Sequence, residues 1–197
     1  MEKNKISFEH IKIAEFVEQN SKVLDLGCGN GTLMEYLEKM KNVNVQGIEI
    51  SEDYIYECVE RGLCVLHTDF NKGLDAYNDG SFDFVILSQS LQQVKNIDTV
   101  LDEALRVGRK VIIGFPNFAH FSLRVDMLIN GRAPVTDCLP ENWNNTPNIR
   151  FLSIKDFENF CKNKNYKIIA KNFISDGKNI CCFANLLAKQ AIFVITR

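Results

Sequence analysis

Three glycines in one short turn form the segment of this sequence best suited to binding a small molecule. The run DLGCGNG, residues 25–31, follows a short apolar stretch and places glycine at every second position. Glycine lets a backbone turn tightly and approach a ligand where a Cβ atom would collide, at a cost in conformational entropy. We therefore interpret Gly27, Gly29 and Gly31 as a ligand-binding loop, in which Cys28 fills a small space.

The spacing of this loop discriminates between classes of ligand. A dinucleotide fingerprint starting at Gly27 requires glycine at position 32, which is Thr32 here. The Gly-Lys-Ser/Thr signature of a phosphate-binding loop is also absent from the run. Asp25, just before the loop, suits an ammonium group and disfavours a pyrophosphate by like charge. The pattern Asp-x-Gly-x-Gly-x-Gly resembles the cofactor loop of class I methyltransferases, which implies S-adenosylmethionine or S-adenosylhomocysteine as the cofactor.

Further polar side chains follow the next predicted strands. Glu49 ends the second strand, where a carboxylate can accept two hydrogen bonds from the vicinal hydroxyls of a ribose, and Ile50 lies beside it. Asp69 follows the third strand and could accept a hydrogen bond from an adenine amino group, while Phe70 packs near the ring. Ser88 follows the fourth strand, where it would border both cofactor and substrate. We expect all five residues to contact the cofactor.

The sequence is less specific about a reaction. Methyl transfer from a sulfonium needs in-line positioning and removal of a proton from the acceptor. His120, in the run FPNFAHF, is the candidate general base. Gln89 would border the substrate, and Arg124 and Arg132 could bind a carboxylate or phosphate. The alternative interpretation is structural, with the His120 ring bonded to a loop carbonyl and both arginines in solvent. The other two histidines are interpreted as structural.

Alternating strands and helices must position these side chains. Apolar runs predict strands at 22–26, 43–50, 63–67, 82–87, 110–115, 167–174 and 191–196, and helical spacing predicts helices at 7–19, 32–39, 52–61, 97–106 and 153–164. This alternation specifies a doubly wound α/β fold with a mostly parallel, seven-stranded sheet and an antiparallel C-terminal strand. An insertion at about 116–150, which holds all four prolines and Trp143, interrupts the alternation.

Composition excludes several classes of protein. With 46% hydrophobic and 24% charged residues, 197 residues suit a single globular domain spanning 1–197. A net charge of -2 and a pI near 6.0 give no long-range attraction for nucleic acid. No apolar run approaches the ~18 residues of a membrane span, and the first ten residues lack the apolar core of a secretory signal, so we expect a cytoplasmic protein. Seven cysteines without a Cys-x-x-Cys pair indicate neither a disulfide framework nor a zinc site.

From about Ser21 to its end, the chain resembles the methionine biosynthesis protein MetW family. The glycine loop is shared by many families, whereas the runs PNFAHF, GRAPVT and NTPNIR are far more specific for this one. The resemblance implies a Rossmann-like methyltransferase fold, a role in methionine biosynthesis and a homoserine O-acyltransferase, MetX, as partner. The matching runs are VLDLGCGNGTL, QGIEIS, SFDFVILSQSLQQV, ALRVGRKVIIGFPNFAHF, GRAPVT, LPENWNNTPNIRFLSIKDFE and FANLLAKQAIFV.

Three functions stay open at this level. In the first, the protein binds S-adenosylmethionine and acts as a partner or activator of MetX. In the second, it is a methyltransferase acting on an unidentified small molecule, with His120 and the two arginines in the substrate site. In the third, the fold serves only protein contacts and binds no cofactor. The lack of an obvious base favours the first, and the retention of Asp25 and Glu49 argues against the third because charges in a cleft are costly without partners.

Overall fold

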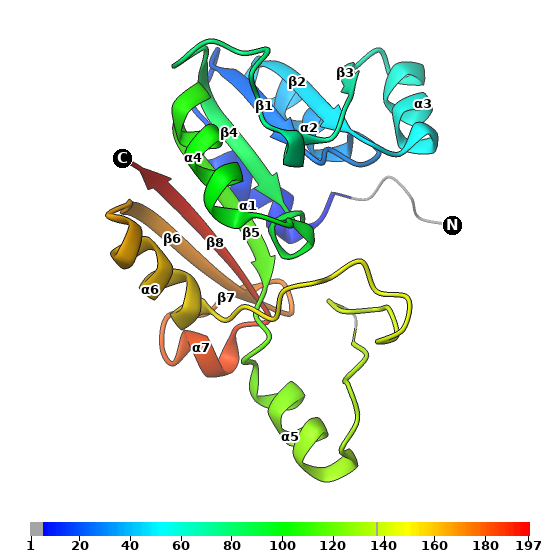
Figure 1. The fold of residues 1–197 in the computed structure, drawn as a ribbon, viewed down its shortest axis with the longest axis vertical. Helices are drawn as coiled ribbons and strands as arrows, with labels where there is room; N and C mark the ends of the chain where they lie inside the picture. The colour runs from blue at the N-terminus through cyan, green and yellow to red at the C-terminus, as the bar shows by residue number, and fades with distance from the viewer. Residues whose placement is uncertain (1–5, 137) are drawn as a thin grey trace.

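The computed structural model describes residues 6–136 and 138–197, and within them eight strands form one twisted sheet (Figure 1). The order across the sheet is β3-β2-β1-β4-β5-β8-β6-β7. The first five strands are parallel, and β8 runs antiparallel to both β5 and β6. The strands are β1 (Lys22–Leu26), β2 (Asn44–Glu49), β3 (Cys64–His67), β4 (Phe82–Ser88), β5 (Gly108–Pro116), β6 (Lys167–Ser175), β7 (Lys178–Asn179) and β8 (Gln190–Thr196).

Helices cover both faces of the sheet. Their buried side chains fall into two clusters, one shared by α1, α2 and α3 and the other by α4 and α6, which is the doubly wound arrangement. No helix in the described ranges is long and apolar enough to cross a membrane. The helices are α1 (Phe8–Phe16), α2 (Thr32–Lys41), α3 (Glu52–Glu60), α4 (Ile97–Val107), α5 (Phe121–Asn130), α6 (Ile154–Lys164) and α7 (Ala184–Leu187), with single 3-10 turns η1 (Phe70–Lys72) and η2 (Leu91–Gln93).

Alternating side chains in the central strands build these two cores. In β4, Phe84 and Ile86 pack on the face covered by α1, α2 and α3, whereas Val85 and Leu87 pack on the face covered by α4 and α6. All four are almost fully buried. Complete burial of such a side chain contributes roughly 1.5–3 kcal/mol. Because both faces are covered, the central strands appear in the sequence as continuous apolar runs.

Strand β1 lies where the strand order reverses, with β2 on one side and β4 on the other. In the register, Asp25 lies opposite Gly47 of β2 and Ile86 of β4. Open α/β sheets form their ligand crevice at this switch point, outside the carboxyl ends of the strands. The fold therefore brings the segments after β1, β2, β3 and β4 to one edge.

The structure contains three elements that the sequence did not predict, β7, α5 and the short helix α7, besides the two 3-10 turns. The sheet has an eighth strand, β7, which pairs with β6 through only two residue positions and is too short and polar to give a periodic signal. The insertion at 116–150 contains α5, which the sequence analysis does not predict. This helix buries only Leu123, whereas most of its apolar side chains are exposed, so no core-facing stripe marks it.

Candidate functional site

The glycine loop leaves β1 in a tight, left-handed turn. Gly27, Gly29 and Gly31 all have positive φ, at 77°, 54° and 75°, a conformation that costs residues with a Cβ about 1–2 kcal/mol each. The amides of Gly27 and Cys28 both donate to the carbonyl of Ile48, at 2.8 and 3.1 Å, which fixes the loop against β2. The loop backbone is therefore held close to the end of the neighbouring strand.

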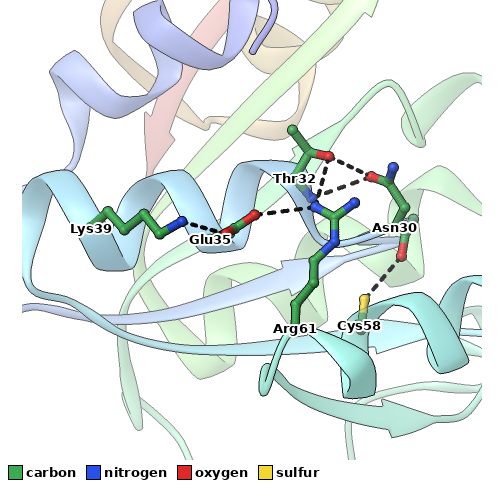
Figure 2. A network of polar contacts seen from close by, with 7 residues as sticks. Asn30, Thr32, Glu35, Lys39, Cys58 and Arg61 are labelled. Carbon is green, nitrogen blue, oxygen red and sulfur yellow. Dashed lines mark hydrogen bonds and ion pairs between the residues drawn. The ribbon is translucent and has the colours of Figure 1, made fainter. Parts of the chain in front are cut away.

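A polar network ties this loop to α2 and α3 (Figure 2). The Thr32 hydroxyl donates to Asn30 Oδ1 at 2.8 Å, and Arg61 Nη1 lies 3.3 Å from both Thr32 Oγ1 and Glu35 Oε2. The Cys58 thiol donates to the Gly29 carbonyl at 3.3 Å. These bonds fix the loop from the side of the helices, so its amides keep one orientation.

A cavity of about 730 Å³ lies over the loop, at the carboxyl ends of the parallel strands. Its size is that of a small-molecule site. It is lined by nine of the ten residues predicted to bind the cofactor, all except Gly31, and also by Gln89. The remaining lining residues, which the sequence analysis does not assign to a site, are His10, Asn30, Thr32, Leu33, Tyr54, Glu57, Thr68, Asn71, Ser90, Gln93 and Lys95.

The Glu49 carboxylate is held by backbone amides on both oxygens. Oε1 accepts hydrogen bonds from Ile50 N at 2.8 Å and Ser51 N at 2.9 Å, and Oε2 accepts one from Gly29 N at 2.8 Å. A carboxylate oxygen can accept two bonds, so Oε2 keeps capacity for one more donor. The side chain is thus oriented in advance at the cavity wall, between the glycine loop and the start of α3.

Asp25 is the most unusual charged group of the site. Its side chain is 2% exposed, and its Oδ1 atom is buried without a hydrogen-bond partner. Burial and, second, the nearby charge of Glu49 raise the pKa of Asp25 to about 7. A buried, unpaired carboxylate costs stability unless a cation or donor meets it. This site is therefore built to receive a positively charged or hydrogen-bond-donating group.

Two further buried polar atoms on cavity-lining residues have no hydrogen-bond partner, Nδ1 of His10 and Oγ of Ser90. Burial lowers the pKa of His10 to about 4, so its ring is neutral at pH 7 and one of its nitrogens can accept a hydrogen bond. Unsatisfied polar groups are uncommon in folded proteins, and their gathering at one cavity indicates a polar ligand. From the sequence alone His10 is interpreted as structural, but the structure places it in the wall of the cavity.

The third strand contributes an ordered turn to the same cavity. Asp69 Oδ1 accepts hydrogen bonds from Asn71 N at 2.9 Å and Asn71 Nδ2 at 2.8 Å, and it caps η1. The Phe70 ring lies over the loop, because a Cβ atom at Gly27 would stand 3.5 Å from Phe70 Cε1. An aromatic ring and a carboxylate thus lie together on this side of the cavity.

Glu9 is a buried acid that the sequence analysis misses. It is 3% exposed and accepts hydrogen bonds from Gln89 Nε2 at 2.7 Å, Ser88 Oγ at 3.2 Å and Gln190 Nε2 at 3.2 Å. Burial raises its pKa to about 7, although the bonds from Gln89 and Ser88 act in the opposite direction. The available signal is its position on the same helix face as the buried Ile13, four residues later. Glu9 fixes the two side chains that border the cavity after β4.

The residues predicted for catalysis and substrate binding lie elsewhere, apart from Gln89. His120 caps α5 and lines a second cavity of about 240 Å³, with its Nδ1 2.7 Å from Ser122 Oγ. Arg124 donates from Nε to the Ala119 carbonyl at 2.6 Å, and Arg132 is exposed. None of these three lines the larger cavity. His120 is the N-cap of α5, and this helix projects beyond the ends of β5 and β8 (Figure 1). No group of three or more potential metal ligands occurs in the described part of the chain.

Comparison with known proteins decides the family. The family model "Methionine biosynthesis protein MetW" matches residues 7–195. The chain belongs to the MetW family. The bifunctional methionine biosynthesis protein MetXA/MetW of Rhodopirellula baltica is 36% identical to this MetW chain over 186 residues, which cover 89% of the chain but 30% of that protein. The chain thus spans about a third of the length of this curated relative, and membership associates it with methionine biosynthesis.

Solved structures similar to this MetW chain are described as S-adenosylmethionine-dependent methyltransferases. One from Archaeoglobus fulgidus has a TM-score of 0.71 at 15% identity, covering 100% of this chain and 97% of that one. Another from Mesorhizobium loti has a TM-score of 0.71 at 14% identity, covering 97% and 98%. At such identities the similarity establishes the fold, a Rossmann-like methyltransferase fold, as the sequence predicts.

Proposed function

We propose that this MetW protein binds S-adenosylmethionine in the 730 Å³ cavity and acts with a MetX-type homoserine O-acyltransferase as its partner or activator. The observation that carries the first part is the set of three buried polar atoms without partners on residues that line this cavity. One of them belongs to a carboxylate, which matches the cationic end of this cofactor. S-Adenosylhomocysteine has the same ammonium, ribose and adenine groups and lacks only the methyl group and its sulfonium charge, so it would fit the same cavity.

Each part of the cofactor has a matching group in the cavity. Asp25 would accept hydrogen bonds from the ammonium of the methionine moiety, whose charge would lower the raised pKa of the carboxyl. Glu49 Oε2 would accept a hydrogen bond from a ribose hydroxyl. Phe70 would pack against the adenine, and Asp69 would accept a hydrogen bond from its amino group. When bound, the cofactor supplies a sulfonium methyl group.

The partnership with the acyltransferase is supported by the relative from Rhodopirellula baltica, described as a bifunctional MetXA/MetW protein. A single chain holds its two parts at high effective concentration, which suits parts that act on each other. In a separate MetW chain, the same contact must form between two molecules. S-Adenosylmethionine is made from methionine, the end product of the pathway. Its binding to MetW would then make the activity of an enzyme at the beginning of the pathway depend on the level of that product.

The test is to measure the rate of purified homoserine O-acyltransferase from the same organism, with and without this protein, across a titration of S-adenosylmethionine. We expect the protein to change the rate and the cofactor to modulate that change. Glu49→Ala should abolish the modulation, whereas Glu60→Ala, at an exposed position of α3, should not. An acyltransferase rate indifferent to the protein at every cofactor concentration would overturn the proposed partnership.

A small-molecule methyltransferase is the alternative function, and one observation favours it. The neutral His10 ring has an unpartnered nitrogen in the wall of the cavity, where it could accept a hydrogen bond or a proton from a methyl acceptor. This function predicts production of S-adenosylhomocysteine that depends on a second substrate and falls at least tenfold in His10→Ala. A screen of candidate acceptors that yields no S-adenosylhomocysteine above the protein-free rate would count against it.

A further inference from the structure

Helix α5 presents an apolar stripe to solvent. Phe121, Val125, Leu128 and Ile129 lie at positions i, i+4, i+7 and i+8, which share one face of a helix. Leu128 is 84% exposed and Ile129 73% exposed. We call these four residues the α5 stripe. An amphipathic helix normally turns such a stripe to the core, whereas this helix buries only Leu123, on another face.

The position of α5 allows it to meet another molecule without disturbing the cofactor cavity. The helix projects away from the sheet, beyond the ends of β5 and β8 (Figure 1). None of its residues lines the 730 Å³ cavity. Its first residue is fixed by the His120 cap and by a ring contact between His120 and Phe121, with centroids 4.7 Å apart. The stripe is therefore held on an ordered helix, which reduces the entropic cost of docking.

Sequence matched by the MetW family model flanks the α5 stripe on both sides. The run PNFAHF, residues 116–121, leads into α5, and GRAPVT, residues 131–136, follows it directly. Both runs lie within residues 7–195, which the MetW family model matches. The α5 stripe therefore belongs to the part of the chain that matches MetW, and the bifunctional MetXA/MetW relative points to a MetX-type protein as the partner.

We propose that the α5 stripe docks into an apolar groove of the MetX-type homoserine O-acyltransferase. The proposal rests on the function proposed above and adds the surface that makes the contact. Helices that dock in grooves use anchors at this i, i+4, i+7 spacing, and an exposed stripe of this kind marks an interaction site. The cofactor cavity stays open in such a complex, so S-adenosylmethionine can bind before or after the partner.

The test compares two variants in which lysine replaces an exposed apolar residue. Leu128→Lys places a charge in the stripe, and Val59→Lys places the same charge on α3, at a position 60% exposed. Both positions lie in the last turn of a helix, where lysine is tolerated. The dissociation constant with the acyltransferase is measured by calorimetry for each protein. We expect Leu128→Lys to weaken binding at least tenfold and Val59→Lys to change it less than twofold.

Each other outcome is informative. If the wild-type protein does not bind the acyltransferase, the proposed partnership fails and this inference fails with it. If it binds and Leu128→Lys binds equally well, the partnership stands and the α5 stripe is the wrong surface. Equal weakening by Val59→Lys would also contradict the inference. A wild-type dimer that Leu128→Lys converts to a monomer, with unchanged partner affinity, would assign the stripe to self-association instead. The thermal midpoints of both variants verify that they fold.

Discussion

The carboxyl of Asp25 lowers the stability of the ligand-free protein, so its removal should raise that stability while it weakens ligand binding. Asp25→Asn keeps the shape of the side chain and removes its charge. The group is 2% exposed, and its Oδ1 atom has no partner. In a folded protein, substitution of a buried polar residue ordinarily destabilises. Here we expect the substitution to raise the free energy of unfolding instead, because the raised pKa means that the folded state disfavours the charged carboxylate.

The size of the effect follows from linkage. The pKa of Asp25 is about 7 in the folded protein and about 3.9 in the unfolded chain. Because the unfolded chain loses this proton more readily, the free energy of unfolding falls as the pH rises from about 4 to 7. The penalty is less than about 1 kcal/mol at pH 4 and roughly 4 kcal/mol at pH 8. The amide of the Asp25→Asn variant does not titrate and carries no such penalty, so the stabilisation should appear mainly at high pH.

Urea unfolding of the wild type and Asp25→Asn at pH 4, 6 and 8 measures this difference. Asp75→Asn, at an exposed position, is the matched control and should be neutral at each pH. In the same Asp25→Asn variant, affinity for S-adenosylmethionine should fall roughly tenfold to a hundredfold, because a charge-assisted hydrogen bond is lost. A variant equally or less stable than the wild type at pH 8, or a gain independent of pH, would refute the reasoning about Asp25.

Two further predictions concern stability. Gly31→Ala should lower the free energy of unfolding by about 2–4 kcal/mol in urea titrations, because its Cβ would stand 2.4 Å from Leu63 Cδ1 at a positive φ. Gly29→Ala, whose Cβ would have no atom within 4 Å, should lower it by only about 1–2 kcal/mol. Equal losses in the two variants would contradict the steric argument. Ser153→Ala should cost about 1 kcal/mol by thermal unfolding because it removes the capping box of α6, whereas Ser51→Ala, whose side chain makes no capping bond, should change little. A similar effect of both serine variants would show that the capping bond is unimportant.

The sequence was sufficient to predict those parts of the site whose residues are close in sequence or lie at the ends of adjacent strands. The glycine loop and Glu49 follow consecutive strands, and the carboxyl ends of parallel strands meet at one edge, so their proximity could be predicted. Helical spacing also predicted a helix from residue 153, and the structure contains reciprocal capping bonds between Ser153 and Asp156 at its start. In these cases the interacting groups are close in sequence or related by the sheet order.

Contacts made across the fold could not be predicted in this way. Glu9 reaches Ser88 and Gln89 from a helix about eighty positions earlier, and nothing in the spacing of α1 specifies that crossing. Helix α5 gave no periodic core signal because its apolar stripe faces solvent. His120 follows the fifth strand in sequence, yet it lines the second cavity and not the cofactor cavity, so its place in the sequence misleads about its place in space.

Calorimetric titration of S-adenosylmethionine into the wild-type protein and Glu49→Ala tests the proposed cofactor site most directly. Glu60→Ala serves as the matched exposed control. We predict saturable binding by the wild type and the control, and a loss of at least tenfold in affinity for Glu49→Ala, because Oε2 would no longer accept a ribose hydroxyl. No heat of binding at millimolar cofactor, or equal affinity in all three proteins, would contradict the assignment of this cavity.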